Sequence, residues 1–184
     1  MALRIGKTLR LSYADEWRAW LEENHATERE VWLVYPHKDT GIRGISYNDA
    51  VDEALCFGWI DSTVKSLDKR HRAQRFTPRR PKSPLSEMNK ERMRRLRAEG
   101  RMTEAGMAAI ADDLDASYEV PTDILATLQA DEETWRNFEA FPESYKRIRV
   151  GWIDGSRNRP DFFEKRLRYF LKMTKANKRF GMVQ

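Results

Sequence analysis

The stretch QRFTPRRPKS, residues 74–83, gathers the side chains of this sequence that are best suited to hold an anion. It supplies cationic groups from Arg75, Arg79, Arg80 and Lys82, and hydroxyl groups from Thr77 and Ser83. Guanidinium forks, hydroxyl groups and the free N–H groups of a first helical turn are the groups that bind phosphate or carboxylate. The pattern therefore indicates an anion site, while a solvated basic loop, or one docked on an acidic segment, would have the same composition.

Asp61 and Trp59 can extend this site from a preceding strand. In the alternating stretch WIDSTVKSL the two side chains share one face, and the next strand carries Arg75. We expect an ion pair between Asp61 and Arg75, which is either a half-exposed structural pair or part of a ligand pocket.

Two polar residues of the following basic segment belong to the same hypothesis. Asn89 and Arg92 fall within the apolar stripe of a helix, and polar groups on a buried face require partners. They either fasten the neighbouring strands or line the pocket of Asp61 and Arg79. The outward cations of this helix, residues 84–99, could instead lie along nucleic-acid phosphates, although a solvated face explains them as well.

The sequence contains no pattern of a metal, cofactor or nucleophile site. His25, His37 and His71 have no paired ligand spacing, and one cysteine offers no thiolate cluster. No phosphate-binding glycine loop, dinucleotide fingerprint or Gly-x-Ser-x-Gly turn is found. Cys56 lies beside the apolar stripe of a helix and is interpreted as a buried structural thiol. We therefore expect no metal and no cofactor.

The elements that position these residues predict an α+β fold, a small antiparallel β-sheet flanked by helices and followed by an all-helical C-terminal lobe. Strands are expected at residues 31–35, 59–67 and 72–78, with an edge strand near 8–11. Helices are expected from Ser12, Ser46 and Ser83, each with that serine as its N-cap, and again at residues 103–114.

The sequence GWID occurs twice, at residues 58–61 and 151–154, but in different contexts. The first copy leads from a helix into a strand, and the second continues the stripe of an amphipathic helix. The repeat is interpreted as accidental, so no duplicated domain is expected. We predict an α+β domain over residues 1–116 and a helical lobe over 117–184 packed on it.

Composition and charge limit the classes of protein. The chain has 184 residues, 34% charged side chains and a net charge of +5. The net charge is −4 for residues 1–64, +10 for 65–101, −9 for 102–140 and +8 for 141–184. These blocks of opposite charge could neutralise one another internally. Neither a signal-like start nor an apolar run of membrane-spanning length occurs. With one cysteine, the expected location is the cytoplasm.

Three longer motifs, SYNDAVDEALCFGWIDS, SLDKRHRAQRFTPRRPKS and NKERMRRLRAEGRMTEAG, resemble the YdeI/OmpD-associated, OmdA-type family, also called bacteriocin-protection proteins. The resemblance extends to EWRAWLEENHATEREVWLVYPHK and to the C-terminal helices. It implies an association with bacteriocin or envelope-stress protection, but no cofactor and no catalytic residue.

The leading hypothesis is a non-enzymatic, stress- or resistance-associated protein that binds a small anionic ligand or a protein partner near Asp61, Arg75 and Arg79. One alternative is an enzyme for small phosphorylated or carboxylated substrates, with Asp61 as acid or base and the arginines as a clamp. Another is a non-specific nucleic-acid binder that uses the basic helix 84–99. The oligomeric state is not indicated by the sequence.

Overall fold

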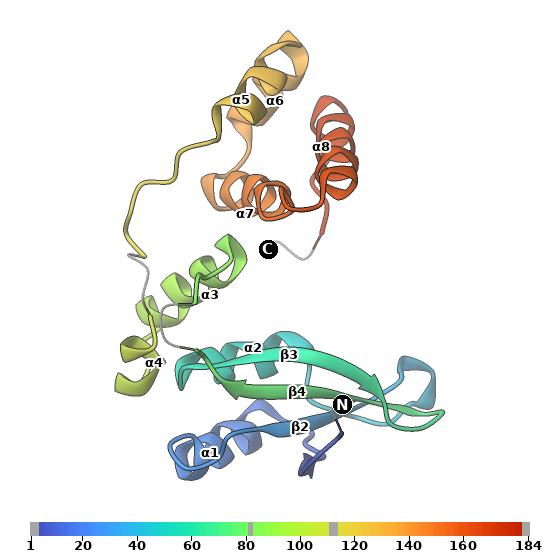
Figure 1. Cartoon of the computed structure of the whole chain (residues 1–184), viewed down its shortest axis with the longest axis vertical. Helices are drawn as coiled ribbons and strands as arrows, with labels where there is room; N and C mark the ends of the chain where they lie inside the picture. The colour runs from blue at the N-terminus through green and yellow to red at the C-terminus, as the bar shows by residue number, and fades with distance from the viewer. Residues whose placement is uncertain (1–3, 81–82, 111–113, 182–184) are drawn as a thin grey trace. The chain divides into compact units, whose positions relative to one another are not determined.

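The computed structural model describes residues 4–80, 83–110 and 114–181, which form two compact units (Figure 1). The first unit comprises Met1–Pro84 and Met93–Asp113, and the second comprises Leu85–Arg92 and Leu114–Gln184. The boundary therefore runs through one helix, α3 (Glu87–Ala98), which contributes residues to both. The division into domains at residue 116 stays a prediction.

A four-stranded sheet in the order β1-β2-β4-β3 organises the first unit. Its strands are β1 (Thr8–Leu9), β2 (Val31–Pro36), β3 (Trp59–Ser66) and β4 (His71–Pro78). β3 and β4 form the predicted hairpin, and β2 pairs antiparallel with β4. The short strand β1 pairs parallel with β2. The α+β class is therefore confirmed, and its sheet is mixed rather than wholly antiparallel.

Two helices, α1 (Ala14–Asn24) and α2 (Tyr47–Cys56), cover one face of this sheet. Trp17 of α1 stacks edge-on against Phe76 of β4, and its indole N–H donates to the Ala50 carbonyl of α2 at 3.0 Å. Both rings are fully buried, and burial of such large apolar surfaces is the main force that holds this unit together.

The predicted helix starts are right for α2 and wrong for two others. The Ser46 hydroxyl accepts from the Asp49 amide at 3.1 Å, as expected of an N-cap. Helix α1 has Tyr13 rather than Ser12 as its N-cap, because the Glu16 carboxylate reaches back to the amides of both residues. Helix α3 begins at Glu87 and not behind Ser83; the Ser86 hydroxyl accepts from the Asn89 amide there.

The end of α2 is closed by a tight contact with α4 (Glu104–Ala108). Gly58 adopts a φ of +73° and turns the chain from α2 into β3. The Cys56 carbonyl then accepts from the Thr103 hydroxyl at 2.6 Å, and a Cβ on Gly106 would lie 2.1 Å from it. Of the helix predicted over 103–114, residues 104–108 are helical, and Ala111 lies outside the described residues.

The second unit is helical, as predicted. Helices α5 (Thr122–Gln129), α6 (Glu132–Ala140), α7 (Glu143–Asp154) and α8 (Pro160–Lys175) bury a shared core that includes Ile124, Phe138, Ile153 and Phe170. The first unit also contains a 3-10 turn, η1 (Lys38–Thr40), which follows β2. Among the helices that the structure describes, none is long and apolar enough to cross a membrane.

The two GWID copies occupy the contexts that the sequence predicts. The first copy spans the turn at Gly58 and the start of β3, whereas the second lies inside α7. The shared letters therefore do not mark a duplicated structure.

Candidate anion-binding groove

Asp61 and Arg75 do not form the predicted ion pair. Asp61 is paired in register with Phe76, so it shares the helix-covered face of the sheet. Arg75 is paired with Trp32 on the opposite face, where its guanidinium binds Glu30 at 2.5 and 2.8 Å. The prediction is wrong because successive residues of a strand point to opposite faces, and the register brings the neighbouring Phe76 opposite Asp61.

Asp61 is held instead by neutral hydrogen-bond donors. Its carboxylate accepts from the Tyr47 hydroxyl at 3.1 Å and from the Gln74 amide at 2.6 Å. The Tyr35 hydroxyl lies buried and has no hydrogen-bond partner among the described residues, and burial followed by the Asp61 charge raises the pKa of this phenol. Hydrogen bonds from these two neutral donors, Tyr47 and Gln74, therefore hold the carboxylate at the start of β3.

The arginine-rich stretch after β4 forms a local turn. The Arg79 guanidinium donates to the Ser83 carbonyl at 2.7 Å and to the Ser83 hydroxyl at 3.2 Å, and that hydroxyl donates to the Arg80 carbonyl at 2.8 Å. Arg80 is exposed, and Thr77 is half-buried on the Arg75 face of β4. Lys82 lies outside the described residues.

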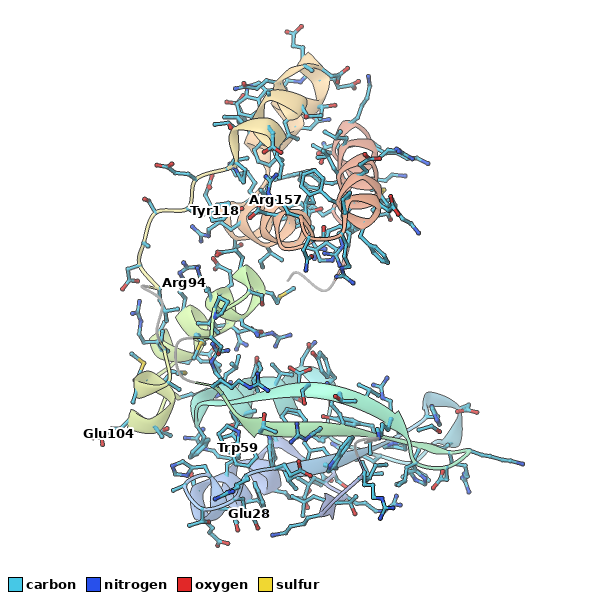
Figure 2. The ribbon with its side chains drawn as sticks, viewed as in Figure 1. Glu28, Trp59, Arg94, Glu104, Tyr118 and Arg157 are labelled. Carbon is cyan, nitrogen blue, oxygen red and sulfur yellow. The ribbon has the colours of Figure 1, made fainter. Side chains whose placement is uncertain are left out.

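Trp59, Asn89 and Arg92 complete the predicted site residues. Trp59 is buried, and its indole N–H donates to the His25 carbonyl at 3.1 Å, which ties β3 to the end of α1 (Figure 2). Asn89 and Arg92 are half-buried and belong to the second unit, whereas the other predicted site residues belong to the first. The predicted binding site around Asp61 and Arg79 stays a prediction.

A groove of about 520 Å³ lies on the second unit, between α7 and α8. The residues that line it are Trp152, Phe162, Lys165, Arg166, Arg168, Tyr169 and Lys172. Among these described lining residues, four are cationic, three are aromatic and none carries a carboxylate. Such a lining provides charges for an anion and flat ring faces for a planar group.

The charge of this groove depends on whether carboxylates pair with its cations. In the described part of the chain, no ion pair joins Lys165, Arg168 or Lys172 to a carboxylate. By contrast, Arg157, which lies in the turn between α7 and α8 and is labelled in Figure 2, binds both Asp123 and Asp154. The groove therefore retains a local excess of positive charge.

Arg166 is fixed within the groove by α7. Its guanidinium donates to the Trp152 carbonyl at 2.5 Å and lies 4.5 Å from the centre of the Trp152 ring. Burial, followed by the charge of Arg159, lowers the pKa of Arg166. Because the side chain is held from two directions, it presents a preformed cation rather than a mobile one.

A second arginine packs against the Trp152 ring. Arg149 of α7 is only 6% exposed and packs against Tyr145, Trp152 and Phe180, at 5.7, 5.9 and 4.8 Å from their ring centres. Within the part of the chain that the structure describes, its Nε atom has no hydrogen-bond partner, and burial lowers the pKa of this guanidinium. A buried cation that faces rings rather than carboxylates adds to the positive potential around Trp152.

The sequence of α8 contains a signal for this groove, which lies outside the site predicted around Asp61 and Arg79. Phe163, Leu167, Phe170 and Leu171 mark the core side of α8 and are partly or fully buried as expected. The other side repeats rings and cations at the same helical spacing, in Phe162, Lys165, Arg166, Tyr169 and Lys172. Reading both sides of the helix would have predicted an aromatic and basic surface.

Comparison with known families divides the chain into two matched segments. Residues 9–109 match a family described as a domain of unknown function, DUF8412. Residues 117–177 match the family described as Bacteriocin-protection, YdeI or OmpD-Associated, OmdA. The chain matches no curated protein and no solved structure.

These matches confirm the family resemblance and relocate it. The motifs that suggest the OmdA-type family lie within 9–109, as do all the predicted site residues, whereas the matched OmdA segment contains every lining residue of the groove. Because the first match spans more than half of the residues, the chain belongs to the DUF8412 family and carries an OmdA-type, YdeI/OmpD-associated domain at residues 117–177.

Proposed function

We propose that this protein is a binding protein whose helical unit holds an anionic ligand with a planar ring in the groove between α7 and α8. The observation that carries the proposal is the lining of four cations and three aromatic rings, with no carboxylate among its described members. Cations supply the attraction for the charge, and the ring faces supply contact area for a flat group.

A binding role is preferred to catalysis because the residues of the enzymatic alternative serve other contacts. Asp61 accepts from Tyr47 and Gln74, and the arginine expected to clamp a substrate beside it, Arg75, binds Glu30. The sequence-based hypothesis of anion binding near Arg79 is kept as a prediction, and the groove is the better-supported place for the same chemistry.

The family description supports a biological setting for this binding. We propose a role in protection against bacteriocins or related stress, because the matched domain is described as Bacteriocin-protection, YdeI or OmpD-Associated. A cytoplasmic location is part of the same proposal and is supported by the single, unpaired Cys56.

Calorimetric titration with adenosine triphosphate and with inorganic tripolyphosphate tests the proposed chemistry. Both ligands carry a triphosphate, but only the first has a ring. We expect the nucleotide to bind more tightly, and Lys165→Ala combined with Lys172→Ala to weaken both ligands by about tenfold. Tyr169→Ala should weaken the nucleotide alone, because the residue contributes a ring and no charge.

Lys69→Ala combined with Arg70→Ala is the matched control. These exposed cations lie in the turn of the β3–β4 hairpin, so the pair removes the same charge from the other unit. The affinity of this control variant for both ligands should stay close to that of the unmodified protein. Equal losses in the groove pair and the control pair would contradict the proposal, because binding would then reflect net charge.

A further inference from the structure

The groove continues into a longer aromatic and basic track along α8. Phe162 and Tyr169 are 50% and 45% exposed, on the side of α8 that faces away from the core. They alternate with the lining cations Lys165, Arg166 and Lys172. From Phe162 to Lys172 the track rises by about 15 Å along the helix axis.

The spacing of the rings exceeds what a single planar group can use. Phe162 and Tyr169 are two helical turns apart, about 10 Å along the axis, so one base cannot stack on both. Two or more bases joined by phosphates can, because the phosphates then pass the cations between the rings. Stacking on rings together with a cationic path for the backbone is the chemistry by which proteins hold single strands.

We propose that the α8 track binds single-stranded nucleic acid, an inference that rests on the proposed function of the groove and names its ligand class. A single strand is favoured over a duplex because the bases of a duplex are stacked within it, which leaves the exposed rings without a partner. Arg159, whose guanidinium lies 4.8 Å from the Phe162 ring centre, extends the cationic path beyond the groove.

A membrane surface fits the same face less well. Interfacial helices bury a continuous apolar side in lipid and keep their cations on the other. Here the continuous apolar side of α8, with Phe163, Leu167 and Phe170, packs into the core of the unit. The exposed side mixes rings with cations, so inserting its rings into lipid would carry Arg166 and Lys172 with them.

Fluorescence anisotropy with the full chain tests the inference. The probe is a fluorescein-labelled oligothymidylate of about twelve nucleotides, compared with a labelled duplex of the same length. We expect tighter binding of the single strand. Phe162→Ala combined with Tyr169→Ala should weaken it by about tenfold or more and leave duplex binding unchanged, because each exposed ring stacks a base.

The salt dependence separates the contribution of the cations. Lys165→Ala combined with Lys172→Ala should make the slope of log affinity against log salt shallower by about 1.4, since two phosphate contacts are lost. The control variants are Tyr13→Ala, which removes a ring 49% exposed on the first unit, and the Lys69/Arg70 pair. Neither should change affinity for the single strand by more than about twofold.

Each other outcome overturns the inference. Equal affinity for single strand and duplex, or no effect of removing both rings, would exclude stacking on this track. Preferential binding to phosphatidylserine vesicles in a sedimentation assay would assign the face to a lipid surface. If the oligonucleotide binds no more tightly than adenosine triphosphate, the single-strand inference fails while the anion-binding function stands; if neither binds, both fail.

Discussion

The fold changes the chemistry of Cys56 by burying its thiol. The side chain is fully buried at the end of α2, and burial raises the pKa of its thiol from 9.0 to about 11. Arg18 and Arg101 lie close enough to oppose this shift, but their effect is smaller than that of burial. A neutral, inaccessible thiol is a structural group rather than a nucleophile.

This pKa predicts how stability responds to alkaline pH. Between pH 9.0 and about 11 the folded protein keeps a thiol proton that the unfolded chain releases, so the free energy of unfolding falls as the pH rises. We expect Cys56 to account for a loss of about 1 to 2 kcal/mol over this range. Urea unfolding at several pH values, compared between the unmodified protein and Cys56→Ala, measures it.

The comparison removes the contribution of the lysines and tyrosines that titrate in the same range. Cys56→Ala should be less stable at neutral pH, because it leaves a small cavity, yet its stability should fall less steeply above pH 9.0. Parallel curves for the two proteins would show that the thiol titrates normally in the folded state.

The residue types around Arg79 do not by themselves reveal which side chains form hydrogen bonds or ion pairs with one another. The cluster around Arg79 is real as a local turn with Ser83, but the partner of Arg75 is Glu30, 45 positions earlier in the chain. Such a partner depends on the register between β2 and β4, which one sequence does not reveal. Asp61 and Gln74 meet across a strand pair for the same reason.

At the scale of elements, the contact between α2 and α4 leaves no room for a larger residue at Gly106. Gly106 lies against the Cys56 carbonyl so closely that any side chain would collide with backbone. The Thr103 hydroxyl accepts from the Gly106 amide at 3.2 Å and donates to that same carbonyl. These hydrogen bonds attach the short helix α4 to the C-terminal end of α2, next to the start of β3.

Gly106→Ala should lower the free energy of unfolding by about 2 to 3 kcal/mol, because the backbone of α2 must move to admit a methyl group. Thermal unfolding followed by circular dichroism measures the loss. Gly100→Ala is the comparison: this glycine has a φ of +68° and open space around it, so only backbone strain of about 1 kcal/mol is expected. A loss for Gly106→Ala no larger than that would refute the steric account.

The elements themselves could be predicted because their signals are local. Periodicity identified the β3–β4 hairpin and the helices of the second unit, and capping chemistry identified the start of α2 at Ser46. The predicted start of α3 is wrong because two serines, Ser83 and Ser86, could each cap the helix. Other errors concern strand pairing, which depends on tertiary contacts. The parallel pairing of β1 with β2 has no local signature in a strand of two residues.

For the whole molecule, the alternating charge blocks are connected in pairs. Cations of 65–101 bind carboxylates of 1–64, through Arg75–Glu30, Arg95–Asp52 and Arg101–Glu53. Carboxylates of 102–140 bind cations of 141–184, through Asp123–Arg157 and Asp131–Lys175. Part of the internal neutralisation that the sequence allowed therefore takes place between neighbouring blocks, beside ion pairs within single blocks such as Arg18–Glu53.

The division into units predicts which fragment folds well. Leu85–Arg92 belongs to the helical unit, where Glu91 binds Arg147 at 2.7 Å and Glu87 packs against Gly151. A fragment of residues 83–184 keeps these contacts, whereas 114–184 lacks them. We expect the shorter fragment to melt lower by at least about 4 °C, measured by calorimetry. Equal melting temperatures would show that this part of α3 contributes nothing to the unit.

The edges of the sheet have a consequence for the behaviour of the protein at high concentration. One edge strand, β1, is two residues long, and the other, β3, is interrupted by a bulge between Asp61 and Val64. The exposed side chains after the bulge are mostly polar, with Val64 as the apolar exception. Short and irregular edges are poor templates for another strand, so neither side of this sheet invites edge-to-edge aggregation between copies.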